Sequence, residues 1–527
     1  MLTPDIVNTL KGYFESMQND VTFVLQTGEH SKRNELIAFL TSIVQTSDNL
    51  KLEERDTHEK LRSALSFFIE VNGVDTGIRF SGIPSGHEFN SLILAILHAS
   101  GTNLKLDESV QKMVTAVSDQ LHFEVFVSLS CHNCPDVVQI LNQFALLNPN
   151  ISTEMIDGGL YPNLIEERDI QGVPSVYLNG ERFANGKIDA ATLINKLVEN
   201  YPQLTEVNKG ESLPMQDVIV IGGGPAGVSA AIYSARKGLK VTVVADRFGG
   251  QVKDTMGIEN LISVPVTTGP ELVGNLADHM KNYDITLKEH VHAVSVESDE
   301  IKTIKLSSGE TMTSRSVIVA TGARWRELGV PGEKENIGNG VAYCPHCDGP
   351  FFKGKDVAVI GGGNSGIEAA LDLAGIVKSV TVFEFMPELK ADSVLVEQAK
   401  KRSNITIKKN VATQQIVAQD GKVVGIEYKD RATEEVDTLP LAGVFVQIGL
   451  VPNSQFVKGV VDTTKHGEII VNEKCLTSEP GIFAAGDVTT VPYKQIVVSM
   501  GEGAKASLAA FEYLLTHQVE EDIAEVA

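Results

Sequence analysis

The chain of 527 residues has few cysteines, a single tryptophan and no long hydrophobic run. A membrane-spanning helix needs about 20 consecutive apolar residues. No stretch approaches that length, although 43% of the residues are apolar. Five cysteines are too few for the dense disulfide framework of a small secreted protein. These shortages predict a soluble protein that neither spans a membrane nor depends on a disulfide scaffold.

Basic residues are scarce relative to acidic ones. The sequence has 45 lysines and arginines against 68 aspartates and glutamates, which gives a formal net charge of −23 at pH 7. Such a charge repels nucleic acid and anionic membrane surfaces, so we predict neither as a partner. The acidity most simply serves solubility, and steering of a basic partner is the alternative.

The length predicts about three to five domains, at about 100–200 residues each. The first residues, Met1–Ile6, lack a basic stretch followed by an apolar core, so we expect no secretory signal. No lipidation motif closes the sequence. We therefore expect a cytoplasmic protein, and in a reducing compartment closely spaced cysteines indicate redox or metal chemistry.

Four of the cysteines form two Cys-x-x-Cys pairs, Cys131/Cys134 and Cys344/Cys347. Pro135, directly after the first pair, suits the first turn of a helix. We therefore expect Cys131 at a helix N-terminus, where partial positive charge stabilises a thiolate. Cys131 would be the more exposed nucleophile, and Cys134 would be the resolving thiol that closes the disulfide.

The residues around these pairs allow other interpretations. Two Cys-x-x-Cys pairs can build a tetrahedral zinc site, but they lie in unrelated sequence contexts, so we predict no metal. His132 and His346, inside the pairs, are either exposed fillers or neighbours that favour a thiolate. Asp348, beside the second pair, is a candidate general acid or base. Cys475 stands alone, and we predict a buried strand residue.

Residues 21–100 and 122–197 look like two versions of one unit. Each version opens with a β-rich run that is followed by an amphipathic helix. Each later reaches an asparagine-glycine turn, at Asn72-Gly73 and at Asn179-Gly180, which is the strongest short hairpin signal. We interpret the two segments as a tandem duplication.

The second version carries Cys131 and Cys134 directly after its first strand, and Gly172-Val173-Pro174 just before its third. Thioredoxin-like domains place a cis-proline at that point, facing the dithiol. The first version has no cysteine in the corresponding loop, and Phe67 falls where the proline would be. The first version therefore resembles a thioredoxin fold without its chemistry.

Two glycine-rich fingerprints, Gly222–Gly227 and Gly361–Gly366, each follow a β-rich run and precede a helical pattern. In that context the glycines allow a tight turn, close approach of the backbone to a pyrophosphate and close helix packing. The amides at the helix N-terminus hold the phosphates. The sequence thus predicts two dinucleotide-binding domains.

A carboxylate about 20 residues after such glycines accepts hydrogen bonds from a ribose 2′-hydroxyl and repels a 2′-phosphate. Glu384 holds this position after the second fingerprint, which favours NADH over NADPH. The alternative for Glu384 is a solvated strand end. Asp246 is the corresponding candidate after the first fingerprint, in a register defined to within one residue.

Two dithiols and two dinucleotide fingerprints on one chain predict an electron relay. A nicotinamide would donate hydride, a flavin would divide its two electrons, one dithiol would take them and the second would carry them to another protein. The polar segment 198–214 contains two prolines and no apolar periodicity, so we predict a linker there.

Residues 215–520 resemble a low-molecular-weight thioredoxin reductase, and the whole chain resembles the flavoprotein subunit of bacterial alkyl hydroperoxide reductase. The resemblance rests on Ser130–Asp136, on Cys344–Pro350, and on Gly486-Asp487 with Tyr493–Gln495. It implies an α/β protein with tandem thioredoxin-like folds followed by two Rossmann-like domains. The implied order is a thioredoxin-like domain without Cys-x-x-Cys (1–100), one with it (101–197), the linker (198–214), the first part of the FAD domain (215–328), the inserted NADH domain (329–449) and the second part of the FAD domain (450–527).

The resemblance also implies roles for particular groups. Cys347 would face the flavin, Cys344 would exchange with the N-terminal pair, and Asp348 would be the acid-base residue. The NADH domain would rotate, because nicotinamide and dithiol cannot both stack on the flavin. A two-cysteine peroxiredoxin is the implied partner and a homodimer the implied assembly. One departure is Asp246, since the family commonly has a glutamate there, which leaves the adenosine-ribose contact of FAD in question.

The fingerprints and the resemblance together predict two sets of cofactor contacts. The FAD contacts are Gly222, Gly224, Pro225, Ala226, Gly227, Asp246, Gly250, Gln251, Asn260, Thr321, Gly322, Gly486, Asp487, Lys494 and Gln495. The NADH contacts are Gly361, Gly363, Asn364, Ser365, Gly366 and Glu384.

We therefore predict an NADH-dependent FAD disulfide reductase. Electrons would pass from NADH to FAD, to Cys344/Cys347, to Cys131/Cys134 and on to a two-cysteine peroxiredoxin that reduces hydroperoxides. One alternative is a general disulfide reductase of the thioredoxin reductase kind. An alternative of another class is an NADH oxidase that makes peroxide from oxygen.

Overall fold

The computed structural model divides the chain into two compact units. One unit comprises Met1–Lys105, Val117–Asp189 and Trp325–Gly449, and the other comprises Leu106–Ala116, Ala190–Arg324 and Leu450–Ala527. The residues that the structure describes are 2–57, 60–131, 134–170, 172–185, 188–210, 213–255, 258, 261–333, 336–337, 339–343, 345–419 and 422–517.

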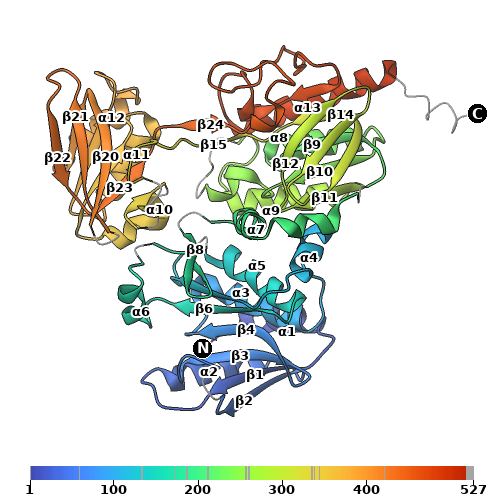
Figure 1. Cartoon of the computed structure of the whole chain (residues 1–527), viewed down its shortest axis with the longest axis vertical. Helices are drawn as coiled ribbons and strands as arrows, with labels where there is room; N and C mark the ends of the chain where they lie inside the picture. Colours follow the sequence, from blue (N-terminus) through green and yellow to red (C-terminus); the bar gives the residue numbers. More distant parts are fainter. Residues whose placement is uncertain are drawn as a thin grey trace, which may run out of the picture. The chain divides into compact units, whose positions relative to one another are not determined.

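The N-terminal part of the first unit is one eight-stranded sheet in the order β2-β1-β3-β4-β6-β5-β7-β8 (Figure 1). The first four strands in this order come from one sequence repeat and the last four from the other, in matching arrangement. Their bounds are β1 Val21–Gln26, β2 Leu50–Arg55, β3 Ser66–Val71, β4 Val74–Ser81, β5 Leu121–Val127, β6 Ile151–Asp157, β7 Ser175–Leu178 and β8 Glu181–Asn185.

The two copies are joined through β4 and β6, which pair in parallel over Ile78–Ser81 and Thr153–Ile156. Each copy contains the predicted hairpin, because Asn72 and Asn179 adopt φ values of 51° and 50°, as the first residue of a type I′ turn requires. The repeated order and the repeated turns confirm the tandem thioredoxin-like folds.

Helices cover this sheet and complete its core. In the first copy, α2 (Arg33–Val44) buries Leu36, Leu40 and Ile43, the three-to-four residue spacing of an amphipathic helix. Phe67 lies between Phe23 and Phe80, with ring centroids 5.7 Å and 5.2 Å away. An aromatic core residue therefore stands where the second copy has its proline. The other helices of the two copies are α1 (Pro4–Phe14), η1 (Gly86–Glu88), α3 (Phe89–Ala99), α5 (Cys134–Leu147) and α6 (Pro162–Glu167).

The first fingerprint directly follows β9, a strand of a seven-stranded sheet in the second unit. The order of this sheet is β11-β10-β9-β14-β13-β12, with β25 paired to β14. The strands are β9 Gln216–Ile221, β10 Val241–Ala245, β11 Ile285–Glu289, β12 Ala293–Ser298, β13 Lys302–Leu306, β14 Thr311–Val319 and β25 Ile482–Ala484. Because β25 returns to this sheet from far along the chain, the first nucleotide domain is split, as predicted.

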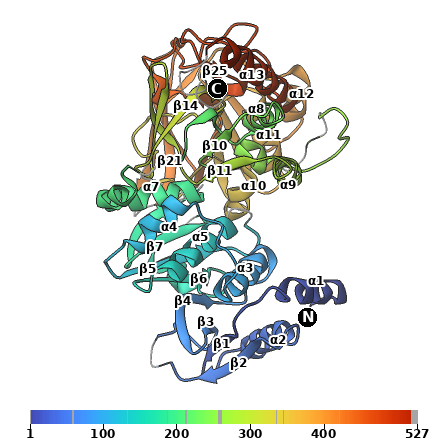
Figure 2. The ribbon, with the colours of Figure 1, turned by 90° about the vertical axis from the view of Figure 1, so that its right-hand side faces the viewer.

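Three helices accompany this sheet: α8 (Pro225–Ala235), α9 (Gly269–Met280) and α13 (Ile496–Thr516). α8 and α13 lie against each other (Figure 2), and the hydroxyls of Ser234 and Ser507 are 2.8 Å apart between them.

The second fingerprint directly follows β17, a strand of a five-stranded parallel sheet in the order β16-β23-β17-β18-β19. Its strands are β16 Val341–Ala342, β17 Asp356–Ile360, β18 Ser379–Glu384, β19 Ile405–Lys409 and β23 Gly443–Val446. The domain adds an antiparallel sheet of β20 (Val411–Gln419), β21 (Lys422–Asp430) and β22 (Val436–Pro440), with helices α10 (Pro345–Asp348), α11 (Asn364–Leu373) and α12 (Ser393–Lys400). Two short strands, β15 (Ala323–Trp325) and β24 (Leu450–Pro452), pair with each other.

The segment predicted as a linker is partly helical. After α7 (Ala190–Asn200), a 3-10 helix η2 (Pro202–Asn208) buries Leu204 and Asn208. The Asn208 amide donates to the backbone carbonyls of Ser109 (2.9 Å) and Ser308 (3.0 Å). Apolar periodicity gives no sign of this anchoring because side-chain to backbone hydrogen bonds hold it. The domain boundaries themselves remain predictions.

A buried ion cluster holds α4 (Glu108–Thr115), the helix that Asn208 contacts through Ser109, within the second unit. The Lys288 ammonium lies 2.9 Å from Glu310 and 3.2 Å from Asp107, the N-cap of α4. All three side chains are nearly inaccessible to solvent. This short helix, which lies between the two repeats in the sequence, is thus fixed by charge as well as by packing.

Cys475 is fully buried, as predicted, but it does not lie in a strand. It lies in a turn with φ of 64°, where the side chain of Asn472 accepts from the backbone amides of Lys474 and Leu476. This asparagine turn replaces the expected strand. The Cys475 thiol donates to Glu502 at 3.1 Å, and burial raises its pKa to about 12.

Within the described part of the chain, every helix is too short or too polar to cross a membrane.

Gly503 of α13 tests the packing of α8 against α13. A Cβ at Gly503 would lie 2.0 Å from the Ala226 carbonyl oxygen, whereas a Cβ at Gly501, on the same helix, would meet nothing within 4 Å. We expect Gly503→Ala to lower the free energy of unfolding by about 1–3 kcal/mol through overpacking. Gly501→Ala should be neutral or stabilise by up to about 1 kcal/mol. Urea unfolding of the two variants measures the difference, and equal stabilities would contradict the packing argument.

Candidate active sites

The N-terminal dithiol lies between the end of β5 and the start of α5. Cys131 keeps 6% of its surface exposed and Cys134 none, so their order of exposure is the one predicted. The Cys131 sulfur lies 3.8 Å from the Val173 carbonyl oxygen, and the Val173–Pro174 peptide is cis. The proline loop therefore faces the dithiol, as expected of a thioredoxin-like site. His132 lies outside the described residues.

Glu88, a residue of the first copy, adds a carboxyl group that the sequence analysis missed. The turn that carries it touches the dithiol loop, because the His87 amide donates to the Leu129 carbonyl at 3.0 Å. Glu88 is fully buried, and burial raises its pKa to about 7. Burial, the Cys131 thiol and the charge of Glu88 all raise the pKa of Cys134. The sequence offered one signal for a buried carboxyl group at this position, because Glu88 is an isolated acid directly before the apolar helix Phe89–Ala99.

The first glycine loop is shaped for a dinucleotide. β9, β14 and β25 run parallel, so their carboxyl ends meet at one edge of the sheet. Gly222 has φ of 118°, and a Cβ there would lie 2.1 Å from the Ala320 carbonyl oxygen. Gly224, beside it, faces open space, which leaves room for a pyrophosphate.

Several predicted FAD contacts converge on this loop. A Cβ at Gly250 would lie 3.5 Å from the Cα of Gly224, and one at Gly486 would lie 3.0 Å from the Cβ of Ala226. The Gln251 amide donates to the Ala323 carbonyl. The remaining described contacts lie in the same unit: Pro225 and Gly227 in α8, Gly322 after β14, and Gln495 at the N-cap of α13. Asn260 lies outside the described residues.

The polar members of this set have defined partners. The Thr321 hydroxyl donates to the Asn453 carbonyl at 2.6 Å. Asp487 accepts from Ser499 at 3.3 Å, and burial raises the pKa of this carboxyl. Lys494 donates to the Thr489 carbonyl. These contacts fix the shape of this edge of the sheet.

Asp246 follows β10 and is half exposed. Its carboxylate pairs with Nδ1 of His292 at 3.1 Å and raises the pKa of that imidazole. β10 is parallel to β9, so Asp246 lies at the same edge of the sheet as the glycine loop. The position suits a ribose contact, with one side of the carboxylate already engaged.

The second glycine loop repeats the first. Gly361 also has φ of 118°, and a Cβ there would lie 2.1 Å from the Gln447 carbonyl oxygen, while Gly363 faces open space. Asn364 and Ser365 form the first turn of α11, and Gly366 packs against Gly361. The Asn364 side chain exchanges hydrogen bonds with Asp392.

Glu384 is buried at the end of β18 and holds the loop. One carboxylate oxygen accepts from the Gly362 amide at 2.6 Å, and the other accepts from the Met386 amide at 2.7 Å. An ionised carboxylate has about four acceptor positions, so it can accept ribose hydroxyls as well. Next to it, the Arg431 guanidinium lies 3.8 Å from the centre of the Phe385 ring.

The second dithiol is described only in part. Cys344 and the side chains of His346 and Cys347 lie outside the described residues. Asp348 ends the short helix α10, and burial raises its pKa to about 7. Asp348 follows Cys347 directly in the sequence, and its raised pKa of about 7 matches that of Glu88.

A dithiol on a thioredoxin-like fold and two dinucleotide cradles define a disulfide oxidoreductase. Residues 216–503 match the family model of the pyridine nucleotide-disulphide oxidoreductases, and residues 121–199 match a thioredoxin domain model. The chain belongs to the pyridine nucleotide-disulphide oxidoreductase family, and its cofactors are FAD and a pyridine nucleotide. The open, glycine-lined edges at Gly224 and Gly363 fit the phosphates of both.

Relatives match nearly the whole chain. The F subunit of alkyl hydroperoxide reductase from Staphylococcus aureus (strain Mu50) is 48% identical over 516 residues, which are 98% of this chain and 100% of the relative. A Bacillus subtilis protein named NADH dehydrogenase is 48% identical over 98% of this chain and 99% of its own.

Two solved structures each align with little more than half of this chain. Thioredoxin reductase from Lactococcus lactis aligns with a TM-score of 0.54 at 34% identity, over 57% of this chain and 99% of its own. Thioredoxin reductase from T. acidophilum aligns with a TM-score of 0.53 at 38% identity, over 57% of this chain and 100% of its own.

The buried carboxyl of Glu88 makes stability depend on pH. Its folded-state pKa of about 7 lies above the ordinary value of 4.5, so the wild type loses stability as pH rises from about 4.5 through 7. Glu88→Gln stays neutral and should be more stable than the wild type at pH 8 by about 3 kcal/mol, with little difference at pH 4. Urea unfolding at both pH values measures this. The control is Glu15→Gln, at an exposed position, and an identical pH dependence in wild type and Glu88→Gln would contradict the assignment.

Proposed function

We propose that this protein is an NADH-dependent reductase of a two-cysteine peroxiredoxin. Electrons pass from NADH to FAD, to Cys344/Cys347, to Cys131/Cys134 and then to the peroxiredoxin disulfide. The observation that carries the proposal is the N-terminal dithiol with its buried carboxyl, fused to a reductase part that the solved thioredoxin reductases match over only 57% of this chain. A built-in carrier replaces a separate thioredoxin. The 48% identity to the F subunit of alkyl hydroperoxide reductase supports a peroxiredoxin as the acceptor.

The cofactors supply hydride transfer and the change from hydride to dithiol chemistry. The chain would supply their binding: amides at the N-termini of α8 and α11 would hold the phosphates, and the Glu384 carboxylate would accept hydrogen bonds from the adenosine ribose hydroxyls of NADH. A 2′-phosphate would place negative charge against this buried carboxylate, which favours NADH over NADPH.

The exchange at the N-terminal dithiol needs two steps. The Cys131 thiolate attacks one sulfur of the peroxiredoxin disulfide, which forms a mixed disulfide and releases one peroxiredoxin thiolate. The Cys134 thiol then gives its proton to the Glu88 carboxylate and attacks the Cys131 sulfur. The Cys131–Cys134 disulfide forms and the second peroxiredoxin thiolate leaves, so two electrons move and the proton remains on Glu88 until it passes to a product.

Asp348 plays the corresponding part beside Cys344/Cys347. With a pKa of about 7 it holds or releases a proton at neutral pH. The two dithiols thus each have a carboxyl group that can hold a proton.

The proposal extends to assembly and location. We propose a homodimer in the cytoplasm. Exposed apolar side chains on the two packed helices of the second unit, Tyr233 on α8 and Val497, Leu508 and Leu515 on α13, support a buried contact between copies. Molar mass by light scattering distinguishes dimer from monomer.

Two competing functions have specific support. The resemblance to thioredoxin reductases favours a general disulfide reductase. The name of the B. subtilis relative favours an NADH dehydrogenase, and with oxygen as its acceptor such an enzyme would be an NADH oxidase. Anaerobic NADH oxidation with oxidised peroxiredoxin or oxidised thioredoxin, each repeated with NADPH, separates them. Turnover with peroxiredoxin and NADH supports the proposal, preference for thioredoxin supports the first competitor, and no turnover with either supports the second.

Cys131→Ser tests the order of the relay. We expect this variant to lose peroxiredoxin reduction while NADH still bleaches the flavin absorbance at the wild-type rate, because the substitution removes only the terminal nucleophile. Stopped-flow absorbance under anaerobic conditions measures both. Cys475→Ser, at the cysteine outside the pairs, is the control and should keep turnover. Loss of flavin reduction together with peroxiredoxin reduction in Cys131→Ser would refute the order.

Glu384→Ala tests nucleotide selection. We expect kcat/KM for NADH to fall by about tenfold, since a hydrogen bond to a charged group is lost, and the preference over NADPH to narrow. Glu388→Ala, at an exposed acid four residues on, should leave both unchanged. If the ratio of the two kcat/KM values stays at the wild-type level in Glu384→Ala, Glu384 does not select the nucleotide.

A further inference from the structure

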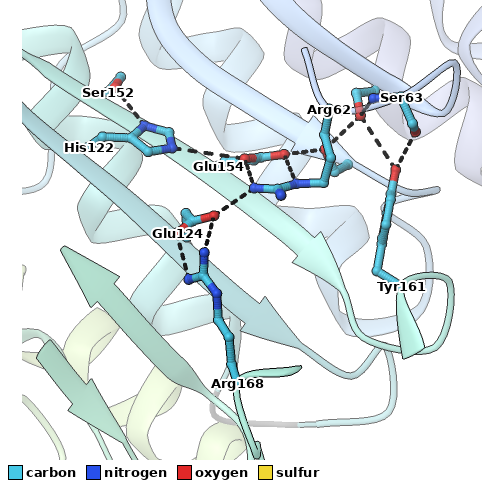
Figure 3. Close-up of polar contacts among 10 residues, drawn as sticks. Arg62, Ser63, His122, Glu124, Ser152, Glu154, Tyr161 and Arg168 are labelled. Carbon is cyan, nitrogen blue, oxygen red and sulfur yellow. Dashed lines mark hydrogen bonds and ion pairs between the residues drawn. The ribbon is translucent and has the colours of Figure 1, made fainter. Parts of the chain in front are cut away.

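A chain of four charged side chains links the two thioredoxin-like copies (Figure 3). Glu124 on β5 and Glu154 on β6 belong to the second copy, and Arg62, in the segment before β3, belongs to the first. The Arg62 guanidinium donates to Glu124 at 2.6 Å and to both oxygens of Glu154 at 2.9 Å and 2.7 Å. Arg168, after α6, donates to both oxygens of Glu124 at 2.6 Å and 3.2 Å.

The two carboxylates of this charged group are buried, the two arginines are partly buried, and their charges balance. The side chains of Glu124 and Glu154 are 6% exposed. Although burial alone would raise the pKa of Glu124, Arg168 and Arg62 together hold it below its ordinary value. Burial lowers the pKa of the neighbouring His122, which bonds to Ser152 at 2.9 Å, so this imidazole adds no charge near neutrality. Two cations therefore face two anions.

The same carboxylates have the spacing of metal ligands with His122. Each is already engaged by an arginine, and a divalent cation would have to displace a guanidinium that is held in good geometry. The cluster is therefore better explained as a device that fixes the positions of these side chains than as a metal site. A guanidinium that bridges two carboxylates fixes direction as well as charge, which an ammonium cannot do.

Arg168 connects this group of charged side chains to the loop between α6 and β7, which contains Val173 and Pro174. Its guanidinium lies 4.6 Å from the centre of the Tyr177 ring, and its carbonyl accepts the Tyr177 hydroxyl at 3.2 Å. Arg168 thus holds one end of the loop that runs to Pro174. Near the other end of this loop, the Val173 carbonyl oxygen lies 3.8 Å from the Cys131 sulfur.

We infer that Arg62 is a positioning residue for disulfide exchange at Cys131, acting through Glu124 and Arg168 on the loop that presents Val173. The inference rests on the proposed function of Cys131 as the exchanging thiol. It gives the first copy, which has no dithiol, a task in the chemistry of the second. Arg62 orients Glu124, Glu124 orients Arg168, and Arg168 sets where the loop lies when a partner disulfide approaches.

The experiment compares full-length wild type with Arg62→Ala, Arg62→Lys, Arg168→Ala and the double variant Arg62→Ala/Arg168→Ala. The control is Arg55→Ala, which breaks an ion pair with Glu70 inside the first copy. Two quantities are measured: amide hydrogen exchange of the peptide spanning residues 168–176, and the single-turnover rate with which the reduced protein reduces oxidised two-cysteine peroxiredoxin. Arg62→Lys keeps the positive charge but cannot bridge Glu124 and Glu154 as the guanidinium does. It therefore tests the role of Arg62 even if Arg62→Ala does not fold.

We expect faster exchange of the 168–176 peptide and a reduction rate that falls by about tenfold in Arg62→Ala and Arg62→Lys, as misplacement of a reacting group produces. Arg55→Ala should change neither, and the rate of flavin reduction by NADH should be unchanged in all variants. The double variant should be no slower than Arg168→Ala, because both residues act along one chain of contacts.

Wild-type exchange of this peptide in Arg62→Ala and Arg62→Lys would overturn the inference, and so would fully additive effects in the double variant. The hydrogen-exchange measurement needs no peroxiredoxin. A wild-type protein that fails to reduce peroxiredoxin would therefore refute the proposed function, while the loop measurement would still decide the role of Arg62.

Discussion

The N-terminal half depends on the main-chain pairing of β4 with β6. This ladder joins the sheets of two copies into one, and it leaves neither copy an open edge at that point. It also brings the first copy within reach of the second copy's chemistry: Glu88 lies in a turn that touches the dithiol loop, and Arg62 bonds to Glu124 and Glu154. The first copy lacks cysteines, yet its polar groups lie against the dithiol loop and bond to the second copy.

The pKa values of the buried acids of this protein shift in opposite directions, depending on their partners. At Glu88 and Asp348 the effect of burial prevails, so their pKa values rise to about 7, and they can hold and release a proton near neutral pH. Glu124 is also buried, but Arg168 and Arg62 keep it ionised. The first kind of acid suits proton transfer, and the second kind suits the fixing of a position. Sequence position alone does not tell them apart.

The sequence predicted the tandem thioredoxin-like folds and both glycine loops, because these depend on local patterns: β-rich runs, asparagine-glycine turns and glycines before helices. The split of the first nucleotide domain rests on the distant pairing of β25 with β14, and it was expected from the family resemblance alone. It missed Glu88 and Arg62 because their partners are distant in sequence and reach them only through the β4–β6 pairing. It predicted a strand at Cys475 where Asn472 imposes a turn, and it gave no sign that Asn208 anchors part of the expected linker.

The two backbone hydrogen bonds of Glu384 have an evolutionary consequence. The same carboxylate that suits the ribose also closes the loop around the Gly362 and Met386 amides. A substitution that made room for a 2′-phosphate would leave two amides without their acceptor and loosen the phosphate cradle at the same time. A change of nucleotide preference at this position would therefore need a second substitution that gives these two amides a new acceptor.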